Sequence, residues 1–156
     1  MKKRLLSALL ALALVFVLLP TTALADTTPV TDENVKINGT PVTVGNGISL
    51  GEGNGTYSYD KSTRTLTLNN ATITATGSNI GIDFCDTTNY VTYSVILTGE
   101  NTVTSNNIAI ETTPNTNLTF TGGGNLKAIT NGYYQAIRVY IRQLSLKMLK
   151  MHPMPA

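Results

Sequence analysis

A repeated pattern of short alternating segments is the feature that most limits what this chain can fold into. Three long segments combine an apolar alternation, a corner rich in Asn or Gly, and a second alternation, at 65–74, 94–104 and 117–128. A shorter segment with an Ile-containing centre follows each of them, at 79–83, 107–111 and 135–139. The long segments begin 29 and 23 residues apart, a period typical of solenoids and too long for hexapeptide helices. Stacked repeats that bury a face on each neighbour are therefore expected.

The corner inside each long segment indicates a sharp bend. In the first segment the alternation changes phase, from Leu66 and Leu68 to Ala71 and Ile73. Asn69-Asn70 lies at the change, and Asn tolerates the left-handed backbone that such a bend needs. Thr98-Gly99 and Thr121-Gly122 occupy the same place in the other two segments. Strand, corner, strand, corner and short strand make one coil of a parallel β-helix, so an all-β fold of about three coils is predicted; an antiparallel β-sandwich is the alternative.

A β-hairpin region is expected before the repeats. Apolar pairs in period two are separated by the turn signals Asn38-Gly39 and Asn46-Gly47, which favour tight turns between strands. Farther along, 55–59 and 64–70 flank a polar four-residue turn, and their Thr and Tyr content favours strands. The folded region is expected to span residues 35–139.

Composition excludes several classes of protein. The chain contains 26 Thr and 15 Asn but only 20 charged residues, which is unlike a coiled coil, a charged helical bundle or a charged disordered tail. A single Cys and a single His, His152, leave no Cys-based zinc site and no His-based nucleophilic triad in the repeats. Residues 26–137 carry four basic against nine acidic residues, a charge of −5, so a nucleic-acid partner is not expected.

The first 25 residues have the three-part layout of a secretory signal peptide. Lys2, Lys3 and Arg4 precede an apolar run over 5–19, and Ala23-Leu24-Ala25 provides a small-residue cleavage site. Fifteen residues fall short of the roughly 20 that a membrane-spanning helix needs. We expect a secreted protein, either free or associated with the cell wall, with no membrane contact after cleavage. A flexible polar leader is expected over 26–34.

Residues 140–156 depart from the repeats. This basic segment contains no Gly, Asn or Thr, and it holds three of the four Met residues. As a helix, it would align Ile141, Leu144, Met148 and Met151 on one face. The abrupt change in composition favours a frameshifted or broken end, which would leave a fragment with an uncapped stack.

The Thr, Asn and Gly motifs resemble those of a known bacterial group. The run Tyr59-Asp60-x-x-Thr63-x-Thr65-Leu-Thr-Leu-Asn-Asn, with the runs 97–104 and 118–126, is similar to secreted right-handed β-helix proteins of Gram-positive bacteria, of the carbohydrate-binding-domain type. The resemblance covers roughly 35–139 and implies a right-handed helix, polysaccharide binding and, in some members, calcium. This chain has fewer coils than the resemblance implies and no wall-attachment module.

Tyrosines are the candidate ligand-binding residues, because the ring offers an apolar face to sugar C–H groups and a polar tip. Six lie in or near the repeats: Tyr57, Tyr59, Tyr90, Tyr93, Tyr133 and Tyr134. Strand packing is the competing role for each of them.

An acidic column is the candidate metal site. Asp83 and Glu111 end equivalent short segments, so a β-helix would place them side by side, with Asp86 and Asn89 in the adjoining loop. Stacked strands lie about 4.8 Å apart, and like charges at that distance repel unless a cation or a basic group lies nearby. Oxygen ligands without His or Cys suit Ca²⁺; a solvated acidic column without an ion is the alternative.

Three functions remain open at this stage. The first is a non-catalytic module that binds a polysaccharide of the cell wall or the environment. The second is a structural or adhesive surface stalk, and the third is the remnant of a polysaccharide-active enzyme. Scattered acids and scarce bases argue against paired-carboxylate or lyase chemistry, so an enzyme is not expected.

Overall fold

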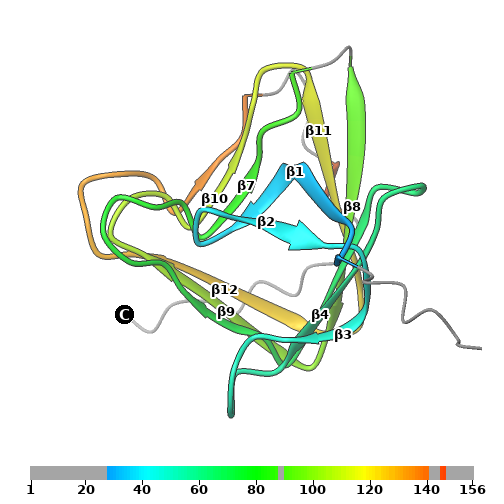
Figure 1. Ribbon diagram of the computed structural model, residues 1–156. Coiled ribbons are helices and arrows are strands. Elements are labelled where there is room, and N and C mark those ends of the chain that lie inside the picture. Colours follow the sequence, from blue (N-terminus) through cyan, green and yellow to red (C-terminus); the bar gives the residue numbers. More distant parts are fainter. Residues whose placement is uncertain (1–27, 88–89, 141–144, 147–156) are drawn as a thin grey trace, which may run out of the picture.

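The computed structural model describes residues 28–87, 90–140 and 145–146, and this part of the chain is all-β, as predicted. Its strands form three sheets, which Figure 1 shows as the sides of a triangle. Sheet A has the order β13 (Ile137–Arg138), β10 (Ile110–Thr112), β7 (Ile82–Phe84), β1 (Thr31–Ile37) and β2 (Thr40–Thr43). Sheet B has the order β14 (Ser145–Leu146), β11 (Thr116–Gly122), β8 (Val91–Thr98), β5 (Thr65–Asn69), β4 (Thr56–Asp60) and β3 (Gly45–Ser49). Sheet C has the order β12 (Asn125–Thr130), β9 (Glu100–Ser105) and β6 (Thr72–Thr74).

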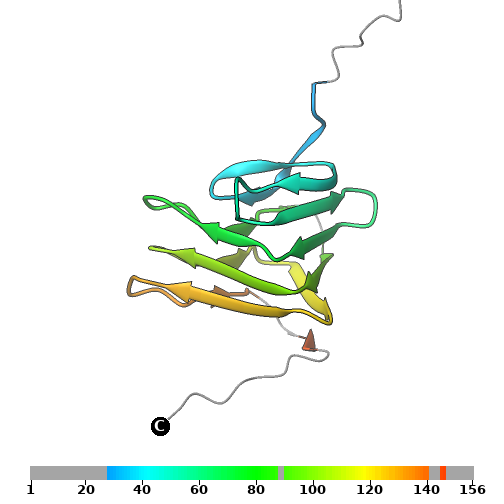
Figure 2. The same cartoon turned by 90° about the horizontal axis from the view of Figure 1, so that it is seen from below.

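Each repeat visits the three sheets in the same order, B, then C, then A. The first repeat contributes β5, β6 and β7, the second β8, β9 and β10, and the third β11, β12 and β13. Equivalent strands pair in parallel, so that Leu66, Val95 and Phe120 lie side by side in sheet B. Figure 2 shows the repeats as successive layers, from green to orange. The alternative of an antiparallel β-sandwich is wrong, because the repeats pair in parallel and fill three sheets.

Antiparallel strands cover one end of the stack. β1 pairs with β7 in sheet A, and β4 pairs with β5 in sheet B. Asn38 and Gly39 both have positive φ in the β1–β2 turn, as their sequence predicts. Two predictions need correction. The leader expected over 26–34 ends earlier, since β1 begins at Thr31, and Asn46-Gly47 lies inside β3, where the pairing with β4 shifts register.

The corners between sheets B and C have the predicted backbone. Asn70, Gly99 and Gly122 have φ values of 49°, 67° and 101°. The buried Asn101 side chain links these corners by hydrogen bonds. Ala71 N–H donates to its Oδ1 at 2.9 Å. Its Nδ2 donates to the carbonyls of Thr98, Gly99 and Asn125. One carboxamide therefore links three successive repeats at their bends.

The core lies inside the triangle and consists mainly of aliphatic side chains that alternate along each strand. Leu66, Leu68, Phe84 and Val103 are completely buried, and the Phe84 and Tyr93 rings pack at a centroid distance of 5.2 Å. In sheet C the third repeat is more open than the second: Ala128 is partly buried, whereas its register partner Val103 has no exposed surface. In sheet B the third repeat stays closed, since Leu118 and Phe120 are buried.

Most of the predicted basic tail and the whole predicted signal peptide lie outside the described residues. Of 140–156, the structure describes Tyr140 and the pair Ser145–Leu146. This pair is β14, which adds to sheet B beside β11. The helix considered for this segment does not hold at Ser145 and Leu146, because these two residues form a strand. The residues of its apolar face, Ile141, Leu144, Met148 and Met151, lie outside the described residues. Among the described residues, none form a helix of the length and hydrophobicity that crossing a membrane requires.

Candidate functional site

Three of the six tyrosines predicted to bind a ligand belong to the core. Tyr57, Tyr59 and Tyr93 are buried, so their rings do not face solvent and cannot act as a binding platform. The Tyr57 hydroxyl oxygen accepts a hydrogen bond from Thr43 N–H at 3.0 Å. A sequence signal for burial was present: Tyr57 and Tyr59 pair with Leu68 and Leu66 across the hairpin, on the inward face.

Two buried carboxylates accept hydrogen bonds from the inward tyrosines. The Tyr59 hydroxyl donates to Asp32 Oδ2 at 2.9 Å, and the Tyr93 hydroxyl donates to Asp86 Oδ2 at 3.0 Å. Burial, followed by the bond to a carboxylate, raises the pKa of both tyrosines far above the usual range. Lys61 Nζ lies 3.7 Å from Asp32 Oδ1. Asp32 and Asp86 are therefore buried and hydrogen-bonded within the interior, so they are not open to a substrate.

The structure brings together two of the three predicted calcium ligands and places the third elsewhere. Asp83 and Glu111 are register partners on β7 and β10, so the prediction that they share a column is confirmed. Asp86 instead lies in the interior with Tyr93, and Asn89 lies outside the described residues. Within the described ranges, no group of three or more His, Cys, Asp or Glu side chains is placed to hold a metal ion.

Basic residues flank the two acids. Lys36 is the register partner of Asp83, and Arg138 is the register partner of Glu111. The four residues form an acid–base column across sheet A, in the order Lys36, Asp83, Glu111, Arg138. Burial and the nearby Glu111 raise the pKa of Asp83, while Lys36 lowers it. Arg138 forms an ion pair with Glu111, in which Nε–H donates to Oε1 at 2.6 Å.

Sequence reasoning missed Arg138 because of a one-residue offset. Aligning the third short segment from its first residue puts Val139 beside Glu111, whereas the structure pairs Arg138 with it and Ile137 with Ile110. The charge of Arg138 was the available signal, since a basic residue on the strand beside an acidic column can pair with the nearest acid.

The exposed tyrosines gather in the third repeat. Tyr133 and Tyr134 lie in the turn between β12 and β13, and Tyr140 follows β13; Tyr134 and Tyr140 are 56% and 47% exposed. Tyr90 is also exposed but precedes β8, at another corner of the triangle. Tyr140 was assigned to the aberrant tail, although its ring contacts Arg138 of the third repeat.

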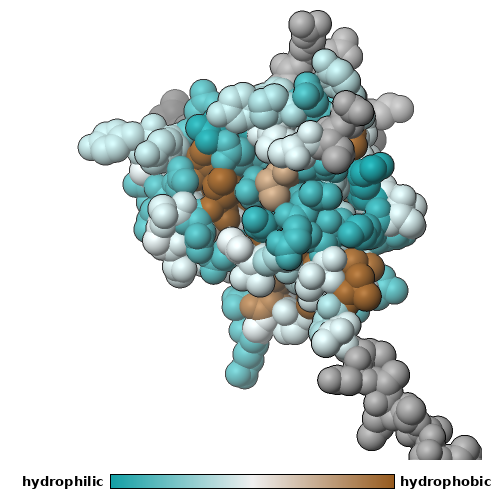
Figure 3. Space-filling view, turned by 45° about the horizontal axis from the view of Figure 1, so that its top comes forward, coloured by the Kyte–Doolittle hydropathy of each residue, from teal (hydrophilic) through white to brown (hydrophobic). Residues whose placement is uncertain are grey.

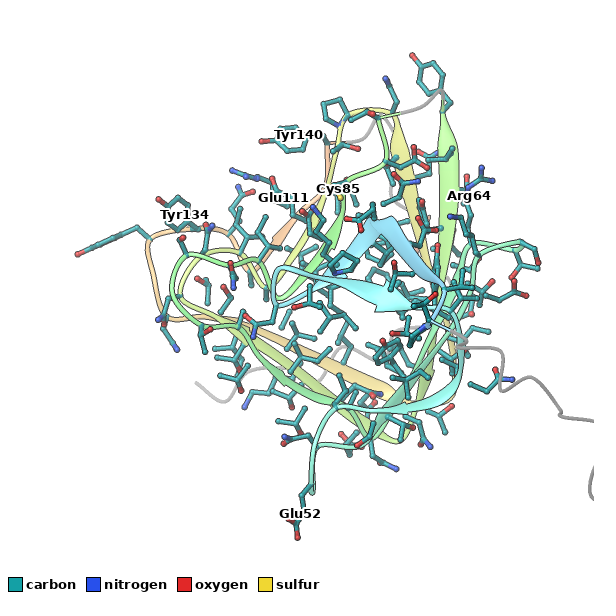
Figure 4. All side chains as sticks on the ribbon, in the orientation of Figure 1. Glu52, Arg64, Cys85, Glu111, Tyr134 and Tyr140 are labelled. Atoms are coloured by element: carbon teal, nitrogen blue, oxygen red, sulfur yellow. The ribbon has the colours of Figure 1, made fainter. Side chains whose placement is uncertain are left out.

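Tyr133, Tyr134, Arg138 and Tyr140 together form what we call the tyrosine surface. Figure 4 shows Tyr134, Glu111 and Tyr140 on the same outer side of sheet A. The Arg138 guanidinium carbon lies 5.3 Å from the centroid of the Tyr140 ring, a cation–π contact that steadies both side chains. Tyr140 N–H donates to Thr112 Oγ1 at 3.3 Å and ties this segment to sheet A. Elsewhere the molecular face in Figure 3 is mainly hydrophilic, with separate hydrophobic patches.

Cys85 and one open pocket are further features of the described residues. The thiol of Cys85 is half-buried and bonds to the Glu33 carbonyl at 3.1 Å, and burial raises its pKa, so it is poorly suited to act as a nucleophile. An open pocket of about 240 Å³ lies where sheet C lacks a covering strand, and it is lined by Ile37, Asn38, Leu50, Asn54, Thr72, Ile73 and Thr74. It contains neither a charged nor an aromatic side chain.

No protein-family model, curated protein or solved structure matches the chain. Its function is therefore inferred from its own residues.

Proposed function

We propose that this protein is a secreted, non-catalytic carbohydrate-binding module built on a right-handed parallel β-helix. The ligand is a polysaccharide of the cell wall or the environment, and the tyrosine surface holds it. The observation that carries the proposal is the exposure of Tyr133, Tyr134 and Tyr140 beside the third repeat, with the Tyr140 ring against Arg138.

The β-helix part of the proposal is supported by the order of the strands. Three successive repeats visit sheets B, C and A, and the second and third each pair in parallel with the repeat before. A connection between parallel strands is right-handed in nearly all known cases. The Asn and Gly corners supply the bends that such a coil needs.

Sugar binding is supported by the chemistry of the surface. Tyrosine rings present flat apolar faces with a polar tip, which suits the C–H face and the hydroxyls of a pyranose. Arg138 lies between the exposed rings in sequence, and its side chain is 37% exposed. Its planar guanidinium supplies several N–H donors for sugar hydroxyls. Rings and donors on one outer face suit an extended polysaccharide better than a small enclosed ligand.

An extracellular location, in a Gram-positive bacterium, is supported by the N-terminal sequence and by the Thr, Asn and Gly motifs. The run of Lys, apolar and small residues over 1–25 has the layout of a cleaved signal peptide. The buried acids among the described residues are all paired, Asp32 and Asp86 with tyrosines and Glu111 with Arg138, which favours binding over catalysis.

Affinity electrophoresis of the purified protein in gels that contain soluble polysaccharides tests this proposal. We expect retardation by one coherent class of polysaccharide, and about tenfold weaker binding in Tyr134→Ala and in Tyr140→Ala. Tyr90→Ala is the matched control, because it removes an exposed tyrosine at a different corner of the triangle.

The outcomes separate the candidate functions. Equal loss of binding in the Tyr90→Ala variant would remove the tyrosine surface from the proposal. Absence of binding to every polysaccharide would favour the stalk, which acts as a spacer, and release of reducing or unsaturated sugar ends would favour an enzyme.

A further inference from the structure

The charge arrangement beside the tyrosine surface bears on which polysaccharides it accepts. Arg138 is the basic residue within that surface, and its guanidinium is paired with Glu111. The Glu111 side chain is only 12% exposed, so a polar ligand meets the guanidinium before the carboxylate. Glu111 thus holds Arg138 in place and cancels its charge.

The neighbouring charges also cancel. Lys36 and Asp83 are register partners in the same column, so the four residues of the acid–base column sum to zero. Residues 28–140 carry five basic against eight acidic residues, a formal charge of −3. A polyanion approaching this face therefore meets no uncompensated positive charge in the column.

We propose that the tyrosine surface selects neutral over anionic polysaccharide, with Arg138 as a hydrogen-bond donor and Glu111 as the positioning residue that sets this preference. A neutral sugar loses nothing from the charge cancellation, because its hydroxyls need donors and ring faces. A uronate or another anionic sugar would have to compete with Glu111 for the guanidinium. This inference rests on the proposed function.

Matched polysaccharide pairs provide the test. The probes are a soluble neutral β-glucan with its carboxymethyl derivative, and highly methyl-esterified with de-esterified polygalacturonate. Within each pair the backbone is the same and the charge differs. We expect the wild-type protein to bind the uncharged member at least about tenfold more tightly than the charged member.

The variant Glu111→Gln sharpens the test. It releases the charge of Arg138 while keeping a side chain of the same size, so binding to the charged member should rise by about tenfold and should weaken with added salt. Glu100→Gln is the matched control, because it removes the same charge from an exposed carboxylate in sheet C that bonds to Asn125. Thermal melts of both variants verify that the fold is retained.

Each outcome decides the inference. Wild-type binding to the charged members that equals or exceeds binding to the neutral members would overturn it and leave carbohydrate binding intact. An equal rise in Glu100→Gln would overturn the role of Glu111, since net charge alone would then explain the effect. Binding to neither member of either pair would overturn the inference together with its basis.

Discussion

Asn70 Oδ1 lies directly against Gly99 of the next repeat, so closely that a Cβ atom on Gly99 would clash with it. The same Asn70 oxygen accepts a hydrogen bond from Glu100 N–H at 3.2 Å. This corner therefore depends on Gly99 for two reasons, its positive φ of 67° and the space above it.

Replacing Gly99 with Ala should destabilise the protein by about 2 kcal/mol or more, because the substitution combines backbone strain with the clash against Asn70. Urea denaturation measures the change in the free energy of unfolding. Gly123→Ala is the control, since a Cβ atom there meets nothing within 4 Å. Equal losses in the two variants would mean that the corner does not constrain residue 99.

The variant Asn101→Asp should cost about 3 kcal/mol of stability, because a carboxylate cannot donate to the three carbonyls that Asn101 now satisfies. The exposed Asn46 in β3 offers a matched control, Asn46→Asp. Unfolding midpoints in urea compare the two. A loss below 1 kcal/mol, on the order of a surface change, would show that the buried carboxamide is dispensable.

Asp83→Asn should stabilise the protein at neutral pH by less than about 1 kcal/mol. Burial and Glu111 raise the pKa of Asp83, so its charged form is disfavoured in the folded state. The folded protein then binds more protons than the unfolded chain between the usual and the raised pKa, and wild-type stability falls as pH rises through that window. The advantage of the variant should vanish below the usual aspartate pKa.

Asp60→Asn should change the stability at neutral pH in the opposite direction. Hydrogen bonds from Ser62 and Thr63 lower the pKa of Asp60, so its charged form stabilises the fold. This variant should be less stable than wild type at neutral pH, and the difference should disappear as pH falls through the lowered pKa. Denaturation curves at several pH values measure both differences. A gain in stability in Asp60→Asn, or a loss in Asp83→Asn, at neutral pH would contradict the corresponding prediction.

Millimolar Ca²⁺ should leave the melting temperature of the protein unchanged. Lys36 and Arg138 already compensate the two stacked acids, and Asp86 is turned toward Tyr93 in the interior. Thermal melts with Ca²⁺ or with chelator measure the effect. A rise with Ca²⁺ that Asp83→Asn abolishes would restore the calcium site predicted from the sequence.

Much of the fold follows from local signals. Period-two alternation identifies the strands, and Asn38-Gly39, Asn70 and Gly99 mark bends because few other residues tolerate positive φ. The inward position of Tyr93 was also readable, since it alternates in phase with Val95 and Leu97. The leader prediction failed at Thr31–Asn34, where polar residues enter β1 and bury Asp32 against Tyr59.

The sequence by itself determined the strands, their corners and the length of the repeat, because these depend on backbone preferences and on alternation between near neighbours. Only the tertiary structure decided how the third repeat sits on the second. A shift of one residue moves every side chain to the other face of a sheet, and sequence similarity was too weak at 135–139 to exclude that shift. The register of β13 on β10 placed Arg138 beside Glu111. This contact joins residues that are 27 apart in the sequence, and it holds Arg138 in the surface to which we assign binding.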